Sequence, residues 1–160
     1  MEASVQDLKY AKLCIELANQ AYETDNDLPF ACIIVRDDAI IVRAKNRVRS
    51  GDATKHAEVL ALQDAQKILG SSDLSGCTLY SNVEPCPMCS FMIRELKVSK
   101  VCFSLSSPVM GGYTKWPILQ DVSLADITPF GHPPKIIKGI LSDEAKKDFD
   151  KLGWIVFDEN

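Results

Sequence analysis

Two short segments of the chain carry residues that together can bind and use a metal ion. The first holds His56 and Glu58 two positions apart, and the second holds Cys86 and Cys89 three positions apart, directly after Pro85. Imidazole nitrogen and thiolate sulfur are ligands that Zn²⁺ prefers in proteins. We therefore expect His56, Cys86 and Cys89 to bind one catalytic zinc ion per chain.

The two cysteines must lie on the same side of their backbone to share a metal. Residues three apart do so on the first turn of a helix, and Cys86 can cap such a helix with Pro87 at its first position. The positive end of the helix dipole is also expected to lower the pKa of both thiols.

His56 and Glu58 need a different arrangement, because residues two apart on a regular helix point in nearly opposite directions. They converge only if His56 stands at the irregular start of its helix, for which Thr54 is a plausible N-cap. Three protein ligands leave one tetrahedral position open for water, whose pKa zinc lowers to about 7. Glu58 is then suited to moving protons during hydrolysis.

Two other interpretations of the metal motif have less support. A structural site with two cysteines and two histidines would need His132, which two following prolines place in an extended surface turn. A redox-active cysteine pair would leave His56 and Glu58 unexplained.

Composition limits the class of protein. With 160 residues and 46% hydrophobic content, the chain is expected to form a single domain spanning residues 1–160. A net charge of −4 favours a small-molecule substrate over nucleic acid or an anionic membrane. The N-terminal residues contain no signal peptide or membrane span, so we expect a cytoplasmic location. The remaining cysteines are expected to be buried core residues rather than disulfides: Cys14, Cys32, Cys77 and Cys102.

Hydrophobic spacing predicts strands alternating with helices, which indicates an α/β domain whose later strands are parallel. Helices are predicted at residues 8–18 (reaching about residue 21), 57–69, 87–96 and 142–152, with a short one from Ile118. Strands are predicted at residues 31–35, 39–42, 78–81, 101–105 and 135–140, the first two forming a hairpin.

These motifs resemble the cytidine deaminase-like superfamily, especially its guanine, fungal-type cytosine and tRNA adenosine deaminases. The resemblance extends from about Leu8 to Leu152 and includes the segment Leu28-Pro29-Phe30-Ala31. It implies a three-layer α/β/α sandwich with a five-stranded mixed sheet, usually assembled as a homodimer. It also implies hydrolysis of an exocyclic amine to a carbonyl with release of ammonia.

The resemblance implies further contacts with the substrate. Asn46 would hydrogen-bond the base, the backbone around Ala57 and Val83 would add donors and acceptors, and Phe30 would lie in the pocket wall. Without the resemblance, Asn46 would be interpreted as a polar turn residue.

The apolar C-terminal segment, residues 153–160, is interpreted as an active-site lid that includes Trp154, Phe157 and Asp158. The alternative for this segment is simple docking on the core.

The choice of substrate depends on weaker signals. Around Met110 to Trp116 the chain lacks an acidic pair that bacterial guanine deaminases carry, and Asp121 is the nearest acid. This difference weakens the assignment of guanine as the substrate. Acidic residues follow Lys146 and Lys147, which weakens the assignment of tRNA as the substrate. Four cations at period two, Arg43, Lys45, Arg47 and Arg49, could bind phosphate along an extended segment or merely protect a strand edge.

We therefore expect a free nucleobase, nucleoside or related small amino-heterocycle as substrate. tRNA adenosine deamination is the enzymatic alternative, and a catalytically silent partner subunit is the alternative without activity. A silent subunit would be expected to lack the glutamate that Glu58 supplies.

Overall fold

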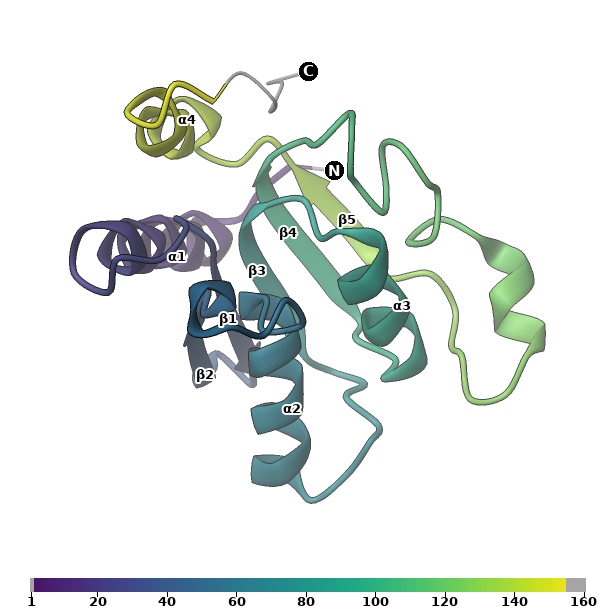
Figure 1. Cartoon of the computed structure of the whole chain (residues 1–160). Coiled ribbons are helices and arrows are strands. Elements are labelled where there is room, and N and C mark those ends of the chain that lie inside the picture. Colours follow the sequence, from purple (N-terminus) through teal and green to yellow (C-terminus); the bar gives the residue numbers. More distant parts are fainter. Residues whose placement is uncertain (1, 155–160) are drawn as a thin grey trace.

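The computed structural model describes residues 2–154, in which four α-helices and five β-strands alternate along the chain (Figure 1). The helices are α1 (Val5–Glu23), α2 (Ala57–Leu69), α3 (Pro87–Glu95) and α4 (Ser142–Asp150). The strands are β1 (Ala31–Arg36), β2 (Ala39–Lys45), β3 (Thr78–Val83), β4 (Lys100–Leu105) and β5 (Lys135–Lys138). Two 3-10 helices, η1 (Val48–Ser50) and η2 (Val122–Asp126), lie in the connections. Every long helix and every strand predicted from hydrophobic spacing is present.

The strands form one mixed sheet in the order β2-β1-β3-β4-β5. β1 is antiparallel to both β2 and β3, whereas β3, β4 and β5 are parallel. The predicted parallel arrangement of the later strands is confirmed, because each is reached through a crossover that returns the chain in the same direction.

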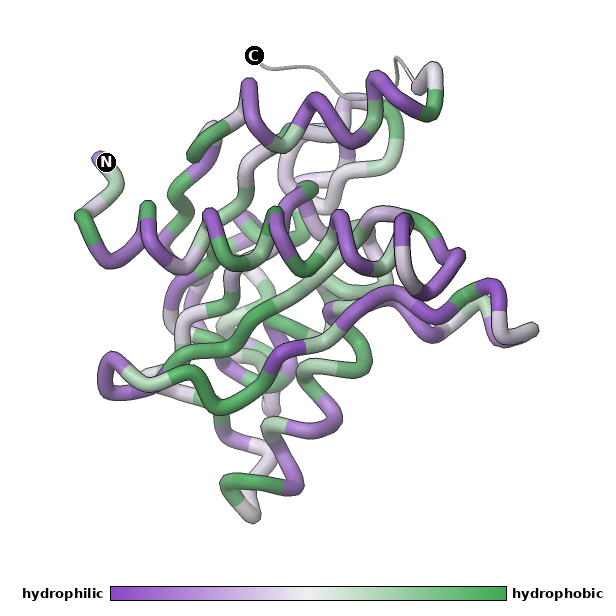
Figure 2. The backbone as a smooth tube through the Cα atoms, turned by 90° about the vertical axis from the view of Figure 1, so that its left-hand side faces the viewer, coloured by the Kyte–Doolittle hydropathy of each residue, from purple (hydrophilic) through white to green (hydrophobic). Residues whose placement is uncertain are grey.

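Helices cover both faces of the sheet. α1 packs with Ile33 and Tyr80 on one face, while α2 and α3 pack with Ile34 and Leu79 on the other. Because both faces are buried, β1 and β4 are largely apolar, and Figure 2 shows hydrophobic stretches of backbone in the middle of the molecule. This is the expected α/β/α sandwich. Across residues 2–154, no helix combines the length and apolar character that crossing a bilayer requires.

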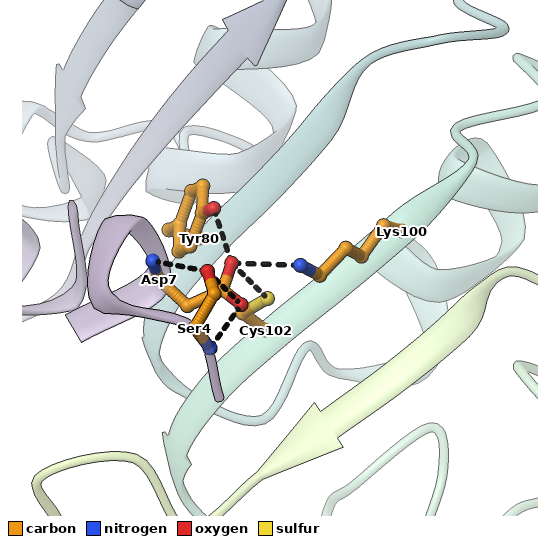
Figure 3. A network of polar contacts seen from close by, with 5 residues as sticks. All are labelled: Ser4, Asp7, Tyr80, Lys100 and Cys102. Atoms are coloured by element: carbon orange, nitrogen blue, oxygen red, sulfur yellow. Dashed lines mark hydrogen bonds and ion pairs between the residues drawn. The ribbon is translucent and has the colours of Figure 1, made fainter. Parts of the chain in front are cut away.

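A buried carboxylate holds α1 against the sheet. Asp7 completes a capping box with Ser4 at the start of α1, and its Oδ1 atom accepts hydrogen bonds from the Tyr80 hydroxyl and the Lys100 ammonium group, both at 2.7 Å (Figure 3). Tyr80 and Lys100 belong to β3 and β4. One side chain therefore joins the first helix to two central strands.

The hairpin between β1 and β2 turns through Asp37 and Asp38. Both residues have positive φ, at 51° and 58°, as the two central positions of a type I′ turn require. The turn therefore places Arg36 opposite Ala39, the pair of residues next to it in the hairpin.

The short helix predicted from Ile118 is wrong. Residues 118–120 form a turn, and the helical segment is η2, four residues later. The cause is the buried Arg94, whose guanidinium donates to the carbonyl oxygens of Ile118 and Asp121, each at 2.7 Å. The Ile118 carbonyl oxygen is therefore occupied by a side chain rather than by the next helical turn.

The extended segment predicted to carry four cations ends at Lys45, although Arg43, Lys45, Arg47 and Arg49 all line one groove. β2 ends there, and Arg47 and Arg49 belong to the start of η1 and to η1 itself. Two hydrogen bonds favour this change of direction: the Arg49 amide donates to Asp27 Oδ2, and the Ser50 hydroxyl donates to the Arg47 carbonyl.

Candidate active site

The metal-binding residues lie at the start of two helices, beside the carboxyl end of β3. His56 is the N-cap of α2, with extended backbone angles of −64° and 147°, and Cys86 is the N-cap of α3 with Pro87 following it. The predicted irregular position of His56 is confirmed. Thr54, however, is not the cap, because its amide and hydroxyl both hydrogen-bond to Asp52 Oδ1 in the preceding turn.

The ligand atoms are spaced as a tetrahedral zinc site requires. The Nδ1 atom of His56 lies 3.5 Å from Cys86 Sγ and 3.6 Å from Cys89 Sγ, and the two sulfur atoms are 3.5 Å apart. Ideal zinc bond lengths place sulfur ligands about 3.8 Å from one another and about 3.6 Å from the nitrogen. His56, Cys86 and Cys89 therefore fit one zinc ion with a fourth position left for water or substrate.

The thiols differ in acidity, contrary to the prediction that both pKa values are lowered. The hydrogen bond from Cys89, supported by His56, lowers the pKa of Cys86 to about 4, whereas the hydrogen bond to Cys86 and burial raise the pKa of Cys89. Two sulfur atoms this close compete for a single negative charge. A divalent cation bound to both would remove that competition.

Glu58 lies on the first turn of α2, next to the metal ligands. Its side chain is buried; Oε1 accepts a hydrogen bond from the Ser81 hydroxyl at 2.9 Å, and Oε2 lies 3.5 Å from Cys89 Sγ. Burial raises the pKa of Glu58, because the charged carboxylate loses its hydration. A carboxyl group in this state is suited to accepting and returning a proton.

A cavity of about 380 Å³ opens onto these residues. His56, Glu58 and Cys86 lie on its polar side, and Phe30 and Trp154 contribute an aromatic wall. The rings of Phe30 and Trp154 are 6.3 Å apart, and Phe149 of α4 packs against both. The cavity thus combines a planar apolar surface with a metal-binding group and a proton carrier.

Comparison with known proteins agrees with this geometry. The profile of the cytidine and deoxycytidylate deaminase zinc-binding region matches residues 4–105. The chain is 36% identical over 149 residues to a probable cytosine deaminase of Schizosaccharomyces pombe, covering 90% of each chain. It is 35% identical over 141 residues to the tRNA-specific adenosine deaminase of Bacillus subtilis, covering 87% of this chain and 83% of that one.

The chain belongs to this deaminase family. Its members are zinc-dependent hydrolases that act on C–N bonds. The fold agrees with a solved structure from a study of A-to-I editing by tRNA:A34 deaminases, with a TM-score of 0.75 and 26% identity over 88% of this chain and 98% of that chain.

Most of the predicted substrate contacts of the deaminase face the cavity. Phe30, Asn46, Val83 and Trp154 all line it. The side chain of Ala57 is buried in the core between α2 and the sheet, so the contact expected from its backbone stays a prediction. The Ser81 hydroxyl lies 2.6 Å from the Val83 carbonyl oxygen and 2.9 Å from Glu58 Oε1, so these two acceptors share its one proton.

The remaining predicted positions lie away from the cavity or outside the described residues. Phe157 and Asp158 lie outside residues 2–154, as does most of the predicted lid. His132 is exposed and is not part of the metal-binding group. The four cysteines outside the metal motif are free and buried, as predicted.

Three buried polar residues near the deaminase site were missed by the sequence analysis. Asp27 contacts Asn46, and Asn82 donates to the Pro29 carbonyl and accepts from the Ala31 amide, which fixes the segment before Phe30. Glu84 accepts hydrogen bonds from Ser107, Tyr113 and Thr114, and so shapes the loop after β4. Asn82 left a signal, because asparagine is rare within an apolar strand. No pattern in the amino-acid sequence indicated that Asp27 is buried.

Proposed function

We propose that the chain deaminates a free nucleobase or a related small amino-heterocycle. The observation that carries this proposal is the cavity at the metal ligands, whose volume of about 380 Å³ suits a small planar ring. The aromatic wall of Phe30 and Trp154 offers stacking area, and Glu58 and His56 lie on the polar side.

In the proposed reaction, water attacks the amino-bearing carbon of the ring, and the carbon–nitrogen bond breaks to release ammonia and form a carbonyl. Zinc bound by His56, Cys86 and Cys89 supplies Lewis acidity that activates water for this attack. Glu58 accepts one proton from the water and passes it to a ring nitrogen. It then takes the second proton from the hydroxyl on the attacked carbon and gives it to the departing amino group, which leaves as ammonia while the carbonyl forms. The Ser81 hydroxyl supports this role, because its bond to Oε1 fixes the orientation of the carboxyl group.

The C-terminal segment is part of the proposal. Trp154 lines the cavity and packs on Phe30 and Phe149, which supports an active-site lid formed by residues 153–160. Such a lid would exclude water from a small base and would hinder a folded RNA, whose flipped nucleotide needs an open mouth.

tRNA adenosine deamination is the second candidate, and two observations favour it. The similarity to the Bacillus subtilis enzyme extends over most of both chains. An open groove of about 900 Å³ adjoins the site at Asn46 and is lined by four cations, Arg43, Lys45, Arg47 and Arg49. Three aspartates line the same groove, and Lys45 pairs with one of them, Asp25, at 2.6 Å, so its capacity for phosphate is reduced.

One experiment separates these functions. Zinc-loaded protein is tested for ammonia release from guanine, cytosine, adenine, cytidine, guanosine, creatinine and aminotriazines, and for inosine formation in an adenosine-containing anticodon stem-loop. Turnover of one small amine that is lost in Glu58→Gln while zinc stays bound would support the proposal. Inosine in the stem-loop alone would replace it with the second candidate, and equal behaviour of wild type and Glu58→Gln would indicate a silent subunit.

We also propose that the protein assembles as a homodimer through the face formed by α3 and the loop after β4. Large apolar side chains are exposed there, including Met88, Phe91, Met110 and Trp116, and a second copy would cover them. Sedimentation velocity of zinc-loaded wild type and Phe91→Lys tests this. A monomeric wild type at micromolar concentration would contradict it.

A further inference from the structure

Asp27 is a buried carboxylate beside the candidate substrate cavity. It lies between α1 and β1, with an exposed fraction of 6%. Its Oδ1 atom accepts hydrogen bonds from the Leu28 amide and from Nδ2 of Asn46, both at 2.8 Å, and its Oδ2 atom accepts from the Arg49 amide at 3.2 Å. The carboxylate therefore connects the segment before β1, the residue after β2 and the helix η1.

The contact with Asn46 determines how that side chain is turned. A carboxamide can rotate by 180°, which exchanges its oxygen and nitrogen, but a carboxylate only accepts hydrogen bonds. Rotation of Asn46 would bring its Oδ1 against Asp27 Oδ1, two acceptors at hydrogen-bond distance. The backbone of Asn46 is fixed as well, since its amide donates to the Phe30 carbonyl at 2.9 Å. Asp27 therefore selects one of the two orientations.

The orientation leaves the oxygen of Asn46 available. Within residues 2–154, no group donates a hydrogen bond to Asn46 Oδ1, although the residue is only 3% exposed. This oxygen has no partner, but the protein does not enclose it fully. It therefore keeps contact with solvent in the cavities that Asn46 lines. A ligand there can satisfy it with an N–H group.

We propose that Asp27 is a positioning residue that determines specificity: it fixes Asn46 so that Oδ1 accepts a hydrogen bond from an N–H group of the bound heterocycle. A ring that presents an acceptor at the same point would meet the lone pairs of Oδ1 and bind less well. The inference rests on the proposed function, since amino-heterocycles carry the required N–H groups.

A purely structural role for Asp27 predicts different behaviour. Its bonds to the Leu28 and Arg49 amides could brace the loops without any effect through Asn46. Asp27→Asn in the wild-type and the Asn46→Ala backgrounds separates the two roles. Its NH₂ group faces one of the two backbone amides in either background, but it can allow the rotated form of Asn46 only where Asn46 is present. Asp25→Asn is the matched control: Asp25 lies in the same loop and pairs with Lys45.

The kinetic test uses the zinc-loaded holoenzyme and whichever of guanine, cytosine or the anticodon stem-loop the wild type turns over. We expect Asp27→Asn to raise KM about tenfold with kcat within about twofold of wild type, since the bond to Asn46 serves binding in ground and transition states alike. In an Asn46→Ala background the same change should have no further effect. An equal loss of kcat/KM in both backgrounds, or an unchanged KM, would overturn the proposal.

A second measurement needs no substrate, and so separates failure of this inference from failure of the proposed function. The side-chain amide signals of Asn46 are assigned in a ¹⁵N–¹H correlation spectrum by their loss in Asn46→Ala. We expect Asp27→Asn to shift these signals and to speed their exchange with deuterium, while Asp25→Asn leaves them in place. Unchanged signals in Asp27→Asn would overturn the proposal whatever the enzyme deaminates.

Discussion

Replacing Asp7 by asparagine should destabilise the fold without touching the candidate active site. Asp7 is buried at the end of the sheet where β3 and β4 begin (Figure 3), whereas the candidate metal ligands lie beside the other end of β3. Asp7 Oδ1 accepts from Tyr80 and Lys100, and Oδ2 accepts from Ser4. An asparagine turns an NH₂ group toward one of these donor sets, which it cannot satisfy.

The cost can be worked out from these contacts. A hydrogen bond to a charged group contributes about 1.5–3 kcal/mol, and the variant loses those from Tyr80 and Lys100. Lys100 recovers part of the loss by turning to water, because its side chain is 25% exposed, whereas Tyr80 is only 4% exposed. We expect the free energy of unfolding to fall by about 2–3 kcal/mol and Tm by about 5–10 °C.

The assay is urea unfolding of zinc-saturated protein at pH 7, followed by circular dichroism, with thermal melts in parallel. The control is Lys67→Ala, which removes an exposed ion pair with Asp64 at 4.0 Å and should cost less than about 0.5 kcal/mol. A loss in Asp7→Asn no larger than in the control would refute the reasoning. So would a change in kcat/KM under conditions where both proteins are folded.

The same variant should abolish one part of the pH dependence of stability. Burial raises the pKa of Asp7, but hydrogen bonds from Lys100, Tyr80 and Ser4 outweigh it and hold that pKa well below its ordinary value. A depressed folded pKa gives stability that is present above the unfolded pKa of about 3.9 and is lost as pH falls through the folded value. The difference between wild type and Asp7→Asn should therefore be constant from about pH 5 to 8 and shrink below about pH 4.

Three further changes test the site and its surroundings. Cys89→Ser should lose zinc in metal analysis and at least about 100-fold in activity, whereas wild type stripped by a chelator should recover on addition of zinc. Gly111→Ala should cost about 1–3 kcal/mol in urea unfolding, because its Cβ would lie 2.0 Å from Glu84 Oε1; an unchanged midpoint would show that the loop yields freely. Trp154→Ala should lower kcat/KM for a small base by about tenfold in steady-state kinetics, and an unaffected value would argue against the proposed lid.

The metal site could be predicted from the sequence because its information is local. Cys86, Pro87 and Cys89 occupy one helical turn, so their spacing alone places both sulfur atoms on one side. The five strands and four long helices could be predicted for the same reason, since each spans enough apolar residues to show its period. The meeting of His56 with the cysteines was inferred from ligand chemistry rather than from any local pattern.

Features that depend on distant contacts could not be predicted. The segment after Ile118 turns where it does because Arg94, twenty-four residues earlier, occupies a carbonyl oxygen there. The extended conformation ends at Lys45, and the chain then turns into η1, where Asp27 accepts a hydrogen bond from the Arg49 amide.

The orientation of Asn46 has the same origin. The sequence by itself determined which residues form the candidate metal site and which elements carry them. The tertiary structure decided which buried polar groups face one another, because a hydrogen bond depends on the positions of both partners in space and leaves no periodic trace along the chain.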